Sequence, residues 1–204
     1  MELPMFPLGT VLFPSEFMPL HVFEPRYRAL AKDCLAGERE FGVVLIERGS
    51  DVGGGDTRTG VGTVARIMEV AALPDGRFLL ATFGMRRIRV ERWLDDAPYP
   101  RAEITDFRQP PAGPDADSVY AEVRAVLRRV LALRSELGES VTEATIELAD
   151  DPGVGSFQAA AVAPLGPIDK QLLLSIPTAD ERLRVLLRLL AAESDVLQQR
   201  LRLG

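Results

Sequence analysis

Few residues in this chain have the chemistry of a catalyst. His21 is the only histidine and Cys34 the only cysteine, so a Ser-His-Asp triad or a reactive thiol has to use these two positions. His21 lies in a short apolar run, and Cys34 lies on the apolar side of a predicted helix. A packed histidine and a small buried thiol are the simpler interpretation. We therefore expect no catalytic residue and no metal site.

The glycine-rich stretch 49–62, GSDVGGGDTRTGVG, is the place where a phosphate-binding loop would be sought. It lacks the G-x-x-x-x-G-K-[ST] pattern, and a predicted strand follows it, so no helix N-terminus points at a ligand. Asp51 and Asp56 would also repel a phosphate. A loop is the better interpretation, and we expect no cofactor.

A basic cluster falls on the predicted strand 85–94. Its members are Arg86, Arg87, Arg89 and Arg92. With strict alternation, Arg87 and Arg89 share a face with Trp93, and the other two arginines lie opposite. A basic and aromatic stripe of this kind can bind RNA. The alternative is a solvated strand paired with nearby carboxylates, which the net charge of −6 favours.

Large apolar residues fall in and beside the connection between two predicted strands, residues 3–8 and 18–23. They are Phe13, Pro14, Phe17 and Met18. Because strand connections are normally exposed, these side chains would form a binding patch for apolar protein segments. Met85 is a further candidate, since methionine suits promiscuous surfaces. The alternative is that the connection folds back and buries them as core.

The first half of the chain predicts about six short strands and one helix. Prolines bound or interrupt the first two strands, which is typical of short or edge strands. Pro25 suits the first position of a helix that ends at Gly37. Pro74-Asp75-Gly76 predicts the turn of a hairpin, and strands at 85–94 and 101–107 follow it. This set predicts a small closed or half-closed β-barrel.

The second half is predicted to be helical. Residues 108–117, RQPPAGPDAD, are rich in Pro, Gly and Asp and predict a linker between a unit at 1–108 and a unit at 117–204. Apolar residues then repeat at helical spacing from Val119 to Leu137.

Shorter helices are expected at 140–150 and 156–163, and two more are separated by Pro177. Thr178 and Glu181 match a capping box for the last helix. The fold class expected is α+β, with a helical bundle after the small barrel.

Composition limits the classes of function. The chain has 204 residues, of which 47% are hydrophobic and 26% charged, as in ordinary globular proteins. The net charge of −6 argues against a general nucleic-acid partner, because such proteins usually carry a basic balance. A single cysteine permits no internal disulfide, which indicates a cytoplasmic protein. Charged residues interrupt every apolar run, so we expect no membrane partner.

Several stretches resemble the N-terminal, substrate-binding domain of the Lon protease family. They are LPMFPLGTVLFP, MPLHVFEPRYRAL, FGVVLI, GVGTVARI, GMRRIRV and, in the helical half, QLLLSIPTADERLRVLLRLLAAE. The resemblance covers nearly the whole chain in the family's order. It implies a PUA-like β-barrel with one inserted helix, followed by a helical bundle. It also implies a structural role for Glu24 and Arg26, which would pair or cap near the start of the helix.

Full Lon proteases also carry an ATPase module with a phosphate loop and a protease domain with a Ser-Lys dyad. This sequence has neither pattern, and Lys32 and Lys170 both fall inside the matched region. The resemblance therefore implies a non-enzymatic module that recognises unfolded or apolar protein segments, for example as an adaptor to a protease or chaperone system. An RNA-binding module is the alternative, and a hydrolase at His21 and Cys34 is the third hypothesis. The oligomeric state is left open.

Overall fold

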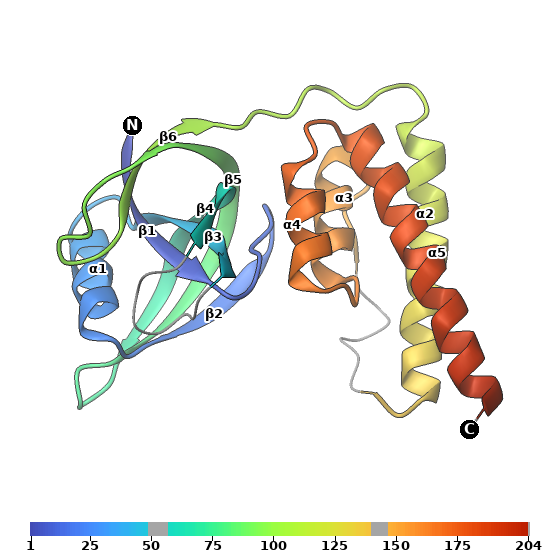
Figure 1. The fold of residues 1–204 in the computed structure, drawn as a ribbon, viewed down its shortest axis with the longest axis horizontal. Helices are drawn as coiled ribbons and strands as arrows, with labels where there is room; N and C mark the ends of the chain where they lie inside the picture. Colours follow the sequence, from blue (N-terminus) through green and yellow to red (C-terminus); the bar gives the residue numbers. More distant parts are fainter. Residues whose placement is uncertain (49–56, 140–146, 204) are drawn as a thin grey trace. The chain divides into compact units, whose positions relative to one another are not determined.

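The computed structural model describes residues 1–48, 57–139 and 147–203. The chain divides into two compact units, Met1–Arg108 and Gln109–Gly204. The first unit combines a mixed sheet with a helix, and the second is helical in its described residues (Figure 1). The fold class is therefore α+β, as expected.

Six strands pair around the first unit. Its described elements are β1 (Glu2–Leu8), β2 (Phe17–Val22), α1 (Pro25–Ala36), β3 (Glu40–Arg48), β4 (Thr57–Ala72), β5 (Phe78–Trp93) and β6 (Arg101–Asp106). The strand order is β2-β5-β4-β3-β1-β6, and β6 also pairs with β5. Along the edge of β5 away from β4, β2 pairs with Phe78–Phe83 and β6 pairs with Ile88–Trp93. The strand β2 therefore lies beside the first part of β5, and β6 lies beside its last part.

The long strand β5 differs from the expectation of a hairpin followed by a separate strand at 85–94. It runs unbroken, and its register shifts where Met85 and Glu91 have no partner. These bulges let one strand bend and serve two neighbours. Its hairpin turn is the predicted one, and Gly76 has a φ of 81°, which favours glycine. The strand β4 begins inside the expected loop 49–62, of which residues 49–56 lie outside the described residues.

The helix α1 begins and ends as its sequence predicts. Pro25 occupies its first turn, and Gly37 follows its last residue. Tyr27, Leu30 and Cys34 form its buried side and pack into a core with residues of β1 to β5. Glu24 makes no side-chain cap, and instead its carboxylate accepts a hydrogen bond from Arg26 at 3.1 Å.

The second unit has four described helices. They are α2 (Ala116–Glu136), α3 (Pro152–Val162), α4 (Pro167–Ser175) and α5 (Ala179–Leu203). The long helices α2 and α5 lie side by side and run in the same direction (Figure 1). Ion pairs at both ends agree with this direction: Arg184 lies 3.9 Å from Asp115, and Arg200 lies 2.9 Å from Glu139.

The helix boundaries of this unit depend on local caps. The helix α3 begins earlier than expected, because the Asp151 carboxylate accepts a hydrogen bond from the Val154 amide at 2.8 Å. Thr178 caps α5 as predicted, accepting from the Glu181 amide at 3.2 Å. Of the helix expected at 140–150, residues 140–146 lie outside the described residues and 147–150 are not helical. None of the described helices is long and apolar enough to cross a membrane.

Candidate functional site

The two candidate catalytic residues, Cys34 and His21, lie in different surroundings. The Cys34 thiol is buried and donates to the Glu40 carbonyl at 3.3 Å. Burial, and then the charge of Asp33, raise the pKa of this thiol to about 12, so it carries its proton at neutral pH. His21 is exposed on β2, with its ring 5.8 Å from that of Phe23. The described residues contain no group of three or more histidine, cysteine or acidic side chains that could hold a metal.

Of the two alternatives for the connection between β1 and β2, burial as core holds for three of the named side chains. Phe13, Pro14 and Met18 are buried in the structure. The reason is that the connection is tied to the sheet. The Thr63 hydroxyl donates to the Leu12 carbonyl at 2.6 Å.

A second tie lies at Gly84 on β5. Its carbonyl accepts from the Ser15 amide, and its amide donates to the Glu16 carbonyl, both at 2.8 Å. An added Cβ on Gly84 would lie 2.0 Å from the Phe13 carbonyl oxygen, so the two segments are in direct contact. Of the five candidates, Phe17 and Met85 are exposed, by 70% and 36%.

Phe17 belongs to a continuous apolar surface on the outer side of the sheet. Three rows of residues cross the strands β2, β5 and β4 there: Phe17–Phe83–Arg66, Pro19–Ala81–Glu69 and His21–Leu79–Ala71. We call the six uncharged, non-histidine members, Phe17, Pro19, Ala71, Leu79, Ala81 and Phe83, the apolar sheet face. The rings of Phe17 and Phe83 lie 4.7 Å apart, and Leu79 is 45% exposed.

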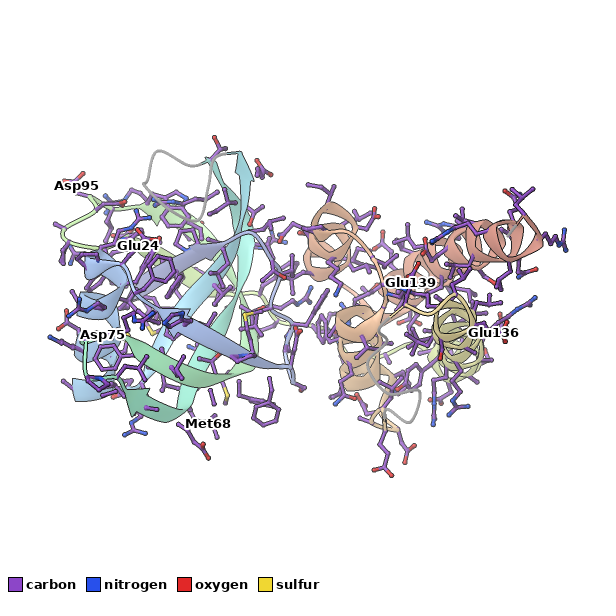
Figure 2. All side chains as sticks on the ribbon, turned by 90° about the horizontal axis from the view of Figure 1, so that it is seen from below. Glu24, Met68, Asp75, Asp95, Glu136 and Glu139 are labelled. Carbon is purple, nitrogen blue, oxygen red and sulfur yellow. The ribbon has the colours of Figure 1, made fainter. Side chains whose placement is uncertain are left out.

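A shallow groove runs along this surface. Its volume is about 300 Å³, and its lining includes Pro19, Glu69, Leu79 and Ala81. Met68, which lies at a register shift of β4, is 48% exposed. Figure 2 shows Met68 on the outer side of the sheet with its side chain directed away from the strands. Clustered exposed apolar side chains beside a groove are typical of a site that contacts another protein.

The arginines of β5 are occupied by contacts within the first unit. Arg86 pairs with Glu40 at 3.1 Å and with Asp106 at 3.0 Å. Arg92 pairs with Glu103 at 2.6 Å. For Arg86 and Arg92, pairing with nearby carboxylates therefore describes the side chains better than an RNA-binding stripe does.

Arg87 and Arg89 lie over one aromatic ring. Their guanidinium carbons are 4.1 Å and 3.8 Å from the centre of the Phe107 ring. Burial, and then the charge of Arg89, lower the pKa of Arg87 to about 10. The expectation that Trp93 shares their face is wrong, because the bulge at Glu91 turns Trp93 toward the core cluster that contains Ile88.

Sequence reasoning missed most of the apolar sheet face. Only Phe17 was among the candidates, whereas Pro19, Leu79 and Phe83 were assigned to ordinary strands. The signal that points to them is the apolar character of both faces of β2 and β5 in FMPLHV and FLLATF. Such runs are usual in strands buried on both sides, and β2 is an edge strand here.

Comparison with known proteins agrees with this architecture. Residues 2–192 match the family model of the ATP-dependent protease La (LON) substrate-binding domain. A Lon N-terminal domain protein from Xanthomonas campestris superposes with a TM-score of 0.66 at 27% identity, over 92% of this chain and 98% of that one. The N-terminal domain of the Mycobacterium avium complex Lon protease shares the fold, with a TM-score of 0.70 at 21% identity, over 94% of this chain and 98% of that one.

Two similar sequences belong to Lon proteases. Lon protease 2 of Herpetosiphon aurantiacus is 31% identical over 97% of this chain, and Lon protease 2 of Myxococcus xanthus is 28% identical over 96%. The fold and these matches define a Lon-type N-terminal module. The chain belongs to the LON substrate-binding domain family. It spans 24% of the length of each of these two proteases.

Proposed function

We propose that this chain is a non-enzymatic module that recognises protein substrates and binds their unfolded or apolar segments on the apolar sheet face. The observation that carries the proposal is the contact between the exposed ring of Phe17 and the half-buried ring of Phe83, beside an open apolar groove. Burying one large apolar side chain on such a surface contributes roughly 1.5–3 kcal/mol. Membership of a family described as substrate-binding supports the same role.

The proposal extends to the organisation of the chain. We take the paired strands of the first unit as a PUA-like barrel and the second unit as a helical bundle, joined near residues 108–117. We propose neither ATPase nor protease activity, because the match covers only about a quarter of each Lon relative. An adaptor that delivers segments to a cytoplasmic protease or chaperone system is the form of this function that we favour.

Fluorescence anisotropy with a labelled, permanently unfolded apolar polypeptide tests the proposal. The double variant Phe17→Ser with Leu79→Ser should weaken binding about tenfold or more, since about 1.4 kcal/mol of lost contact is one factor of ten. Its melting temperature should stay close to that of the wild type, because both side chains are exposed. The matched control is Val196→Ser, which removes a 51% exposed apolar side chain from α5.

Three outcomes would contradict the proposal. Unchanged affinity in the double variant would show that the apolar sheet face is not the site. A wild-type chain that binds no unfolded polypeptide would overturn substrate recognition as such. Binding of a single-stranded RNA that weakens steeply with salt, in place of peptide binding, would move the site to the arginines of β5.

A further inference from the structure

The strand β2 has an open edge beside β1. In the described residues β2 pairs with β5, while β1 pairs with β3 and β6, and no ladder joins β1 to β2. In an antiparallel pair, alternate residues direct their N–H and C=O groups away from the partner strand. Phe17, Pro19 and His21 are the β2 residues directed to this edge. All three offer a C=O group, but only Phe17 and His21 offer an N–H, because proline has none.

A small pocket lies where β2 faces β1. We call it the seam pocket; its lining is Phe6 and Leu8 of β1, Leu20, His21 and Val22 of β2, and Phe23, Glu24 and Tyr27 at the start of α1. Its volume is about 130 Å³. A dry protein cavity of about 150 Å³ lined by similar residues binds benzene, so the seam pocket has room for one aromatic or branched aliphatic side chain.

The seam pocket suits a side chain without charge. Six of its eight lining residues are aliphatic or aromatic, and the Phe6 and Tyr27 rings stack at 4.1 Å in its wall. The one carboxylate in the lining, that of Glu24, already accepts a hydrogen bond from Arg26 at 3.1 Å. A charged guest would lose its hydration in this pocket without gaining a free counter-charge.

We propose that an extended segment of a substrate chain adds to the sheet as a strand beside β2, with one apolar side chain in the seam pocket. This inference rests on the proposed function and specifies how the segment is held. Leu20 and Val22 point toward the core and line the pocket. An inward side chain of an added strand would lie on the same face of the sheet as these two residues and would reach the pocket. Its outward neighbours lie beside Phe17 and Pro19 of the apolar sheet face.

This binding mode selects for unfolded chains. Backbone hydrogen bonds to β2 require N–H and C=O groups that no other strand has taken, and alternate side chains must be apolar and uncharged. A folded protein offers such a segment only at an unprotected edge. The seam pocket and the free edge together therefore recognise an extended, alternately apolar segment rather than any exposed apolar patch.

A set of three labelled peptides tests strand addition. The parent peptide alternates valine and threonine around a central phenylalanine, and its two N-methylated isomers carry methyl groups on one or the other set of alternate amides. The isomer methylated on the amides that face β2 should bind about tenfold more weakly, while the other isomer should match the parent, because an added strand donates from alternate residues only. The isomers are matched in bulk and apolarity.

The outcomes separate this inference from the proposed function. If both isomers bind like the parent, strand addition is wrong, and recognition through the apolar sheet face stands. Equal weakening of both isomers also overturns strand addition. Such a result would show that the bulk of the methyl groups weakens binding, whichever amides carry them. If the parent peptide and the unfolded polypeptide both fail to bind, the proposed function falls as well.

A double-mutant cycle tests the seam pocket. Phe23 is 49% exposed and lines the pocket, so Phe23→Ala should leave the fold intact. It should weaken the parent peptide about fivefold and leave a peptide with central alanine unchanged, as expected for a lost contact between two aromatic rings. The control Val196→Ala should change neither. Equal effects of Phe23→Ala on both peptides would show that the phenylalanine does not occupy the pocket.

Discussion

Tyr99 donates its hydroxyl to the Asp33 carboxylate at 2.8 Å and so ties the segment before β6 to the helix α1. The Tyr99 side chain is buried in the core cluster that α1 covers. Burial, and then the hydrogen bond and charge of Asp33, raise the pKa of Tyr99 to about 12. The phenol therefore keeps its proton, and the bond persists, throughout the neutral range.

Removing this hydroxyl should weaken the first unit. We expect Tyr99→Phe to lower the free energy of unfolding by about 1 kcal/mol, the usual net value of one hydrogen bond. Asp33→Asn, which keeps an acceptor oxygen, should cost less. Urea denaturation followed by fluorescence measures both. A Tyr99→Phe protein as stable as the wild type would show that the bond adds nothing net.

The buried thiol predicts a loss of stability at alkaline pH. The folded pKa of Cys34 is about 12 against an ordinary value of 9.0. Its contribution is therefore complete below pH 9 and is lost as the pH rises toward about 12, because the unfolded chain releases the proton first. Over this window the wild type should lose stability relative to Cys34→Ala in urea denaturation. Parallel pH profiles of the two proteins would contradict the assignment.

Gly84 should tolerate no side chain. Its added Cβ would meet the Phe13 carbonyl oxygen at 2.0 Å, so the connection before β2 has to move. We expect Gly84→Ala to destabilise by about 1–3 kcal/mol, as overpacking does. Gly60→Ala is the control, because nothing lies within 4 Å of its Cβ position. If thermal unfolding shows the same loss of stability for both variants, the cause is the general effect of replacing a strand glycine by alanine and not the contact with the Phe13 carbonyl.

Arg182 should be the most sensitive arginine of the second unit. It is fully buried, its guanidinium lies 3.7 Å from the centre of the Phe157 ring, and its Nε donates to the Ser156 hydroxyl at 3.0 Å. It also donates to the Ile176 carbonyl at 3.3 Å and to the side chain of Gln109.

Arg182→Met should remove at least about 2 kcal/mol of stability, because it leaves buried acceptors without a donor. Circular dichroism during urea denaturation follows the loss of helix. Arg184→Met, at an exposed position of the same helix, should change little. Comparable losses in the two variants would mean that Arg182 does not organise this unit.

Local signals predicted many of the elements. Pro25 and Gly37 gave both ends of α1, Pro74-Asp75-Gly76 gave the hairpin turn, and Thr178 gave the cap of α5. Each of these depends on backbone preferences within a few residues, which sequence carries directly. The break expected after Gly84 was wrong, because this glycine serves a close approach of a distant segment rather than a turn.

Local sequence signals predicted less of the apolar sheet face. The sequence left open whether the connection before β2 is exposed or folds back, and hydrogen bonds to Thr63 and Gly84 hold it against the sheet with Phe13 and Pro14 buried. The residues that complete the apolar sheet face lie on β5, far along the chain from Phe17. Which of them stand side by side depends on strand register, and a shift by one residue exchanges the two faces.

By itself, the sequence determined that a single histidine and a single cysteine leave little room for catalysis, that proline and glycine set the helix ends, and that the chain resembles a Lon substrate-binding domain. Only the tertiary structure decided which side chains are exposed, which carboxylates pair with the arginines of β5, and that β2 keeps an open edge beside the seam pocket. The reason is physical: backbone preferences act within a few residues, whereas burial, ion pairing and strand addition depend on contacts between segments that the register of the sheet brings together.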